Sequence, residues 1–189
     1  MTLRNSFIRA SDDCVCIKAA SYPDPAANRN VKNILVEHCV LWNAEPGNAV
    51  EIGYEVRCDE ISDITFRDLD IVHCQYEGNQ SGGVLTIHNA DRAYIHNIVY
   101  EDIRVEDAQE KFIDIKVLDS KYSLDRSRGR VEDIFFRNIE ILNGNFPVSI
   151  IRGGEMHTEM SRPQNIHFDN VVVLGEHINS PSDLHMVVE

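Results

Sequence analysis

Two adjacent carboxylates, Asp12 and Asp13, stand directly before a short apolar alternation that begins at Val15. Two carboxyl groups held close together repel each other when both are ionised. The pKa of one of them therefore rises, and the pair can divide the roles of acid and base. Such a division suits general acid–base catalysis. A solvated turn is the alternative interpretation of an Asp-Asp pair, and the dipeptide by itself favours that alternative.

The segments that would position this pair repeat along the chain. Five dipeptides, spaced about 30 to 36 residues apart, each open a stretch of alternating apolar residues: Asn33-Ile34, Asp63-Ile64, Asn97-Ile98, Asp133-Ile134 and Asn165-Ile166. A repeat of this length indicates a solenoid, because one unit cannot bury its own apolar face and must stack on its neighbours.

Aligning the five stretches gives three apolar columns and one polar column. The first apolar column holds Val36, Phe66, Tyr100, Phe136 and Phe168. The second holds Cys39, Leu69, Ile103, Ile139 and Val171, and the third holds Leu41, Ile71, Val105, Ile141 and Val173. Between the first two lies a polar column of His38, Asp68, Asp102, Asn138 and Asn170. Short polar side chains tolerate left-handed backbone, so we expect a bend at this column.

A second strand is expected later in each unit, from apolar residues spaced by two: Val50/Ile52, Leu85/Ile87, Ile113/Ile115 and Val148/Ile150. The period of two and the β-branched residues predict strands. The first 18 residues fit the same template, with Leu3, Ser6 and Ile8 in the apolar columns, Asn5 in the polar column and Val15/Ile17 in the second strand. We therefore predict an all-β fold, a parallel β-helix of about six complete or partial coils.

Composition is consistent with a single domain over residues 1–189. The chain is 43% hydrophobic and has no apolar run near the ~20 residues that cross a bilayer. Its formal charge is -13 at pH 7. We therefore expect no nucleic-acid partner and no membrane partner, and an anionic polymer would be repelled.

Cysteine and histidine spacing gives no metal motif. The five cysteines include no Cys-x-x-Cys pair, and Cys39 lies in an apolar column, where we expect a buried free thiol. The eight histidines are spread over different coils, and the loop acids have no recognisable ligand series. We predict neither a metal nor a cofactor.

The segment from Ala10 to Lys18 resembles the catalytic coil of the polygalacturonase-like glycoside hydrolases and of the related dextranases and isopullulanases. The shared pattern is an Asp-Asp pair before a strand and, one coil later, a short Gly-containing strand, here Gly47 to Gly53. Trp42 and the Gly53-Tyr54 pair look closer to the dextranase branch. The resemblance covers most of the chain and implies a right-handed helix, of which this chain would be the C-terminal part without the N-terminal coils.

The resemblance also implies an activity. These families hydrolyse O-glycosyl bonds of polysaccharides with inversion, one carboxylic acid protonating the leaving oxygen and one carboxylate activating water. Carried over to this sequence, Asp12 and Asp13 belong to the catalytic set, and we assign Asp13 as acid and Asp12 as base. A plant or microbial polysaccharide or oligosaccharide is the expected partner.

Three positions depart from the polygalacturonase pattern. The first catalytic Asp of the families would precede Met1. The Gly-His-Gly motif reads Gly47-Asn48-Ala49, and the Arg-x-Lys motif reads Asp114-Ile115-Lys116. Loss of the arginine and the histidine argues against polygalacturonate and favours a neutral glycan.

Positions after each second strand are expected to line a polar groove for the glycan. In-register stacking would align Lys18, Tyr54, His88 and Lys116, with Glu51 and Asn48 beside them. For each residue the alternative is a solvated sheet face, a turn hydrogen bond for His88 or an ordinary surface aromatic for Tyr54. The predicted substrate-binding residues are Lys18, Asn48, Glu51, Tyr54, His88 and Lys116.

The chain opens almost directly on a core strand, without a recognisable signal peptide. Secretion or a periplasmic location is expected if a signal peptide lies upstream. An open terminal coil also predicts self-association, because solenoid ends need caps. After Val173, residues 175–183 are expected to form an irregular exit segment. Two functions from different classes remain at this point: an inverting glycoside hydrolase, or a non-catalytic β-helix that binds glycan or serves as a structural module.

Overall fold

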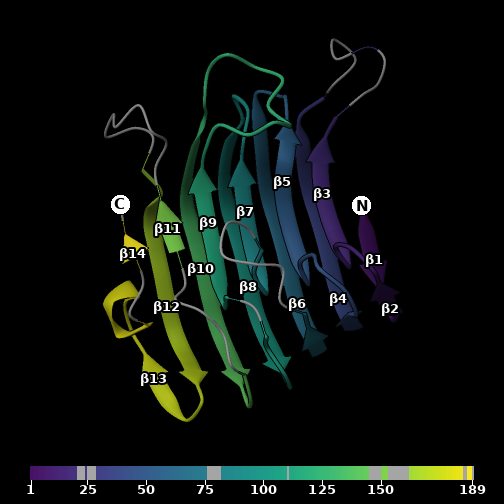
Figure 1. Cartoon of the computed structure of the whole chain (residues 1–189), viewed down its shortest axis with the longest axis vertical. Helices are drawn as coiled ribbons and strands as arrows, with labels where there is room; N and C mark the ends of the chain where they lie inside the picture. Colours follow the sequence, from purple (N-terminus) through teal and green to yellow (C-terminus); the bar gives the residue numbers. More distant parts are fainter. Residues whose placement is uncertain are drawn as a thin grey trace.

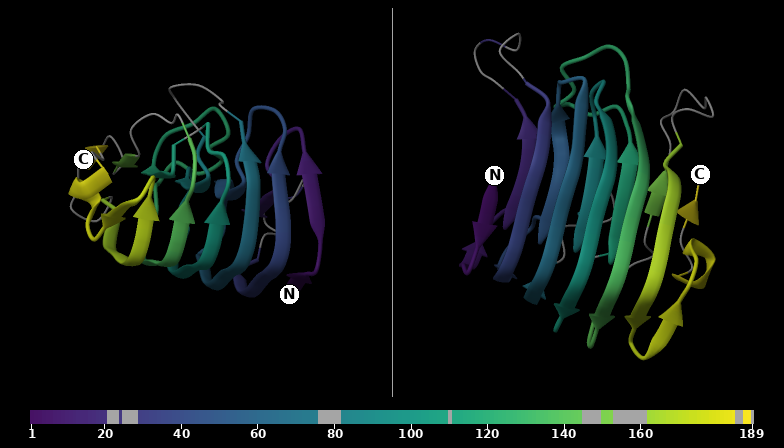
Figure 2. Two further views of the ribbon diagram at one scale, coloured as in Figure 1. Left: turned by 90° about the horizontal axis from the view of Figure 1, so that it is seen from below. Right: turned by 180° about the vertical axis from the view of Figure 1, so that it is seen from behind.

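The computed structural model of the chain describes residues 1–20, 24, 29–75, 82–109, 111–144, 150–152, 162–184 and 187–188. The chain forms a parallel β-solenoid of two sheets that face each other (Figure 1, Figure 2). Successive coils follow one another along the row of strands, so the two termini lie at opposite ends of the row (Figure 1). Among the described residues, no helix has the length and apolar character needed to cross a membrane.

The first sheet has eight strands: β1 (Thr2–Arg4), β2 (Phe7–Ala10), β4 (Val31–Asn43), β6 (Glu60–Cys74), β8 (Tyr94–Val105), β10 (Arg130–Ile141), β12 (Gln164–Val173) and β13 (Glu176–Ile178). The second has six: β3 (Val15–Ala19), β5 (Val50–Val56), β7 (Leu85–Asn89), β9 (Ile113–Val117), β11 (Ile150–Arg152) and β14 (Val187–Val188). A short 3-10 helix, η3, covers Pro181–Leu184.

Strands of consecutive coils pair in parallel, as expected for a β-helix. About four turns are complete, and the terminal strands contribute partial turns. The expected number of about six therefore holds only when these partial turns are included. The right hand of the helix stays a prediction.

The three apolar columns are confirmed by the strand register. In the first column, the rings of Phe66, Tyr100, Phe136 and Phe168 stack with centroids 5.1, 5.1 and 5.2 Å apart. The columns point into the space between the sheets, where nearly all their residues are buried. Cys39 is buried with a free thiol, also as predicted. Residues of one column thus join successive coils into one continuous core.

The polar column bends the long strands of the first sheet. Its five residues, His38, Asp68, Asp102, Asn138 and Asn170, have φ between 50° and 54°. Asn138 Nδ2 donates to Asp102 Oδ1 at 3.0 Å, and Asn170 Nδ2 donates to Asn138 Oδ1 at 3.0 Å. A second left-handed column, which the sequence analysis did not predict, is formed by the residues that open the repeats: Asn33, Asp63, Asn97, Asp133 and Asn165. Asn and Asp occupy both columns because they tolerate left-handed backbone better than other side chains.

Two expectations about the later coils were wrong. Ile150 pairs with Asp114, and Ile151 takes the place opposite Ile115 that was expected for Ile150. Both residues are isoleucine, so alternation could not determine the register; Val148 lies outside the described residues. The segment from residue 175 to 183 is also more regular than expected, since β13 pairs antiparallel with β12 and η3 follows.

Candidate functional site

The outer face of the second sheet carries an unusual buried polar array. Inward positions of its strands are apolar, so the residues between them point away from the core. Two rows of these outward positions follow the register: Cys16, Glu51, Thr86 and Asp114, and beside them Gly53, His88 and Lys116. Glu51, Thr86, His88, Asp114 and Lys116 are each at most 5% exposed. Outward polar residues are usually solvated, so their burial marks this face as a built site.

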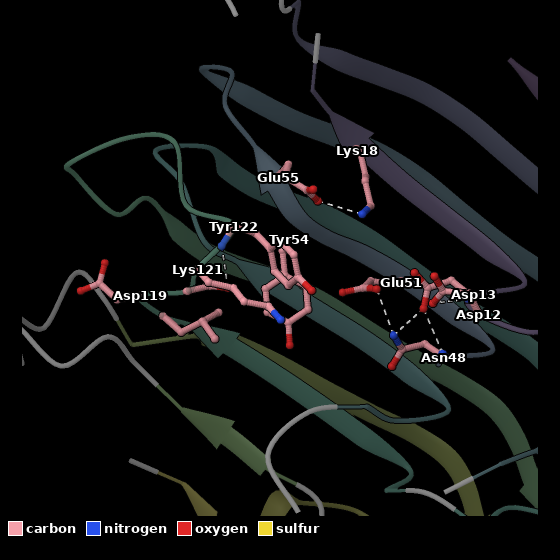
Figure 3. Close-up of a pocket in the computed structure, with 12 residues that line it drawn as sticks. Asp12, Asp13, Lys18, Asn48, Glu51, Tyr54, Glu55, Asp119, Lys121 and Tyr122 are labelled. Carbon is pink, nitrogen blue, oxygen red and sulfur yellow. Dashed lines mark hydrogen bonds and ion pairs between the residues drawn. The ribbon is translucent and has the colours of Figure 1, made fainter. Parts of the chain in front are cut away.

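A groove with a volume of about 560 Å³ adjoins this array at Glu51, which belongs to both. Figure 3 shows the residues that line the groove. It is bounded by the Asp12-Asp13 turn before β3, by β5, and by the segment after β9. Its lining residues are Asp12, Asp13, Lys18, Asn48, Glu51, Tyr54, Glu55, Leu118, Asp119, Ser120, Lys121 and Tyr122. Charged groups and two tyrosine rings thus share one open, mostly polar site.

Asp13 occupies the inner end of the groove. Its Oδ1 accepts hydrogen bonds from the backbone nitrogen of Asn48 at 3.0 Å and from Asn48 Nδ2 at 2.6 Å. The same Nδ2 also donates to Glu51 Oε2 at 2.9 Å, so one amide group bridges two carboxyls (Figure 3). Burial of Asp13, reinforced by the charge of Glu51, raises the pKa of Asp13 to about 6, against the lowering effect of the Asn48 hydrogen bonds.

Glu51 continues the array toward the buried side. Its Oε1 lies 2.8 Å from His88 Nδ1, and His88 Nε2 lies 3.4 Å from Asp114 Oδ2. Asp114 Oδ2 also accepts a hydrogen bond from Lys116 Nζ at 2.8 Å. Burial would lower the pKa of His88, but the flanking carboxylates of Asp114 and Glu51 outweigh it and raise this pKa to about 9. His88 is therefore an imidazolium held between two carboxylates.

The turn that presents Asp12 and Asp13 depends on a glycine in the next coil. Asp12 Oδ1 accepts a hydrogen bond from the Asp13 nitrogen at 2.9 Å, and the Asp12 carbonyl accepts one from Asn43 Nδ2 at 2.9 Å. A Cβ atom at Gly47 would lie 2.6 Å from the carbonyl carbon of Asp12. Gly47 therefore lets the two coils approach closely enough for Asn48 to reach Asp13.

Aromatic side chains form one wall of the groove. The Tyr54 ring stacks on the His88 ring with centroids 4.5 Å apart, and Tyr122 packs against Tyr54 at 5.5 Å. At the outer end, Lys18 Nζ forms an ion pair with Glu55 Oε2 at 2.8 Å (Figure 3). Tyr54 thus faces the groove on one side and covers His88 on the other.

Residues 118–122, the first part of the segment 118–129 between β9 and β10, form a wall of the groove that Tyr122 joins to Tyr54. The buried carboxylate of Asp91 holds this segment in place. Its Oδ1 accepts hydrogen bonds from the backbone nitrogens of Leu124 and Asp125 at 2.6 and 2.7 Å, and its Oδ2 accepts one from Val56 at 3.1 Å. This wall could not be predicted from the sequence, because its signal is a single buried acid, Asp91, on the preceding coil.

The structure brings six of the eight predicted site residues to this one groove. They are Asp12, Asp13, Lys18, Asn48, Glu51 and Tyr54. His88 and Lys116 lie in the buried array beneath it. The expected alignment of Tyr54 with His88 was wrong: Gly53 pairs with His88, and Tyr54 pairs with Asn89. The Tyr54 ring nevertheless contacts His88, because the two rings stack.

One trio of side chains has ligand atoms close enough to surround a cation. Atoms of Asp13, Cys16 and Glu51 lie within 4.8 Å of one another. Both Glu51 oxygens, however, already accept hydrogen bonds from Asn48 and His88. Burial and the two neighbouring carboxylates also raise the pKa of the Cys16 thiol, which opposes formation of a thiolate ligand. We assign no metal to this trio.

Neither a family model nor a curated protein nor a solved structure matches this chain. The parallel solenoid is consistent with a pectin-lyase-like fold. Because a fold hosts many chemistries, the function is argued from the groove itself.

Proposed function

We propose that this chain is a glycoside hydrolase of the polygalacturonase and dextranase type, with Asp13 as the general acid. The observation that carries the proposal is the Asp13 carboxyl, whose pKa of about 6 lets it hold a proton in a polar groove. A carboxylic acid that is protonated near its working pH can donate that proton to a departing glycosidic oxygen.

The second carboxyl role falls to Asp12. Inverting hydrolysis needs about 6.5–9.5 Å between the two catalytic carboxyls to accommodate the attacking water. Oxygen atoms of Glu51 and Asp13 lie within 4.8 Å of each other, which is closer than this separation. Glu51 is also 2% exposed, whereas Asp12 is exposed at the mouth of the groove. We therefore propose Asp12 as the base that activates water, with Glu51 as the group that holds the proton on Asp13.

A neutral glycan is the proposed substrate. The groove carries the acids Asp12, Asp13, Glu51, Glu55 and Asp119, against the bases Lys18 and Lys121. Lys18 is already paired with Glu55, and the whole chain has a formal charge of -13. A uronate polymer would be repelled by this field. The faces of Tyr54 and Tyr122 suit uncharged sugar rings, which present apolar C–H surfaces to aromatic side chains.

Reducing-sugar release from dextran, pullulan, other neutral glycans and polygalacturonate tests the proposal. We expect release from a neutral glycan and its loss, by at least about a hundredfold, in Asp13→Asn, which cannot donate the proton. Asp63→Asn is the matched control, because Asp63 is exposed in a left-handed column where Asn is equally suited. Full activity of Asp13→Asn would contradict the proposal.

Proton NMR of the anomer that is released first tests whether hydrolysis inverts the anomeric configuration. A glycan-binding or structural module is the alternative function. Binding of a glycan from the panel without any release from it would favour that alternative.

A further inference from the structure

The contacts of Asp13 continue from the groove into the buried array. Asp13 and Glu51 share the Asn48 amide, and Glu51 in turn contacts His88, which is fully buried. His88 Nδ1 lies 2.8 Å from Glu51 Oε1, while Asn48 occupies the other oxygen of the same carboxylate. Glu51 is thus held at both oxygens, one on the substrate side and one on the buried side.

We propose that His88 is a positioning residue: its hydrogen bond fixes the Glu51 carboxylate at the place from which Glu51 acts on Asp13. The role of His88 in catalysis rests on the proposed function of Asp13. The effect of the His88–Glu51 contact on Asp13 does not depend on that function. His88 does not line the groove, and of the described side chains that contact it only Glu51 also lies beside Asp13.

The surroundings of His88 keep it charged. The groups that face it are Glu51 and Tyr54 from β5 and Asp114 and Lys116 from β9. Lys116 Nζ lies 2.8 Å and Lys111 Nζ 3.8 Å from Asp114 Oδ2, so lysine charge already balances Asp114. The imidazolium is therefore left to balance Glu51, which is 2% exposed and has no other cation within ion-pair distance among the described residues.

Removing His88 should loosen the hold on Glu51. Without the contact to His88 Nδ1, the Glu51 carboxylate is fixed by Asn48 alone and can turn away from Asp13. The negative charge of Glu51 then acts less strongly on the ionised form of Asp13. The pKa of Asp13 then falls from about 6, yet stays above its ordinary value of 3.8 because burial remains the largest cause of the shift.

The test measures the Asp13 pKa by carbon-13 NMR of labelled aspartate carboxyls, with Asp13→Asn identifying the signal. We compare the parent chain with Glu51→Gln, His88→Phe and the double variant. Phe at position 88 keeps a ring for Tyr54 to stack on and removes the nitrogen that contacts Glu51. We expect each single variant to lower the Asp13 pKa by about one pH unit. The double variant should match Glu51→Gln, because His88 acts only through Glu51.

The control is Thr86→Val, a near-isosteric change in the same buried row. Thr86 Oγ1 donates to the Val50 carbonyl and, among the described residues, forms no hydrogen bond with the side chain of Glu51 or His88. It should leave the Asp13 pKa unchanged. An unchanged Asp13 pKa in folded His88→Phe would overturn the inference, and so would a double variant that differs from Glu51→Gln. If His88→Phe alone does not fold, the Asp13 pKa of the double variant is compared with that of Glu51→Gln. This comparison then decides whether the inference holds.

This titration needs no substrate, so it separates the two proposals. The expected shifts without glycan release would overturn the hydrolase and leave the role of His88 intact. Glycan release without the shifts would overturn the role of His88 alone.

Discussion

At the scale of single residues, the raised pKa of Asp13 has a cost in folding stability. Asp13 has a pKa of about 6 in the folded chain and an ordinary value of 3.8. Between these values the folded chain binds more protons than the unfolded chain, so stability falls as pH rises through this window. A shift of two pH units in the pKa corresponds to about 3 kcal/mol, which we discount to about 1–2 kcal/mol because Asp13 is only partly buried.

Asp13→Asn should therefore stabilise the chain at neutral pH. The amide keeps an oxygen that can accept the two Asn48 hydrogen bonds and carries no charge to bury. We expect the variant to be more stable than the parent by about 1–2 kcal/mol at pH 7, with the gain vanishing below about pH 4. Urea unfolding at both values measures this. A gain that is the same at both pH values would show that charge is not its cause.

The meeting of Asp13 with Asn48 could be predicted from the sequence, since the repeat places residues 35 apart on neighbouring coils. The role of Glu51 could not. Glu51 was expected among the substrate contacts, because nothing in the alternation shows that Asn48 and His88 would occupy its two oxygens. The burial of His88 likewise depends on the Tyr54 ring, which reaches it from a position one residue out of register.

At the scale of elements, the polar columns determine where the long strands bend. Asn138 has φ of 50° and lies between Asp102 and Asn170 in a hydrogen-bonded column. Both Asn138→Ala and Asn138→Gly remove these side-chain bonds, so their difference isolates the backbone. Left-handed backbone costs Ala about 1–2 kcal/mol, partly offset by the greater chain entropy that Gly loses on folding.

We therefore expect Asn138→Ala to be less stable than Asn138→Gly by about 1 kcal/mol. Thermal or urea unfolding of the two variants measures the difference. Equal stability would mean that side-chain bonding, and not the backbone, explains why Asn and Asp occupy the column.

Elements were predictable where the repeat and the period of two agree. The apolar columns and most of the second strands lie where the sequence placed them. Agreement ended at β11, where two adjacent isoleucines made the register ambiguous. The conformation of residues 118–129 was not predictable either. Backbone hydrogen bonds to Asp91 hold this segment, and its sequence has no periodic pattern.

At the scale of the whole molecule, the coils are joined by columns of stacked side chains. Phe136 lies in the aromatic column between Tyr100 and Phe168, is 1% exposed, and also packs at 6.0 Å against Phe112 from the opposite side of the core. In a solenoid, stability is approximately a sum of repeat terms and nearest-neighbour interfaces. A cavity at this position should therefore weaken two interfaces at once.

Phe136→Ala should lower the free energy of unfolding by about 3–5 kcal/mol, through lost burial and a residual cavity. Hydrogen exchange should accelerate in β8 and β12, which flank the cavity, more than in β4. Tyr100→Phe is the control in the same column: its ring keeps the stack, and the hydroxyl that it loses has no hydrogen-bond partner among the described residues. That change should be neutral or slightly stabilising. Equal acceleration in all strands after Phe136→Ala would show that the coils unfold as one cooperative unit rather than through their nearest neighbours.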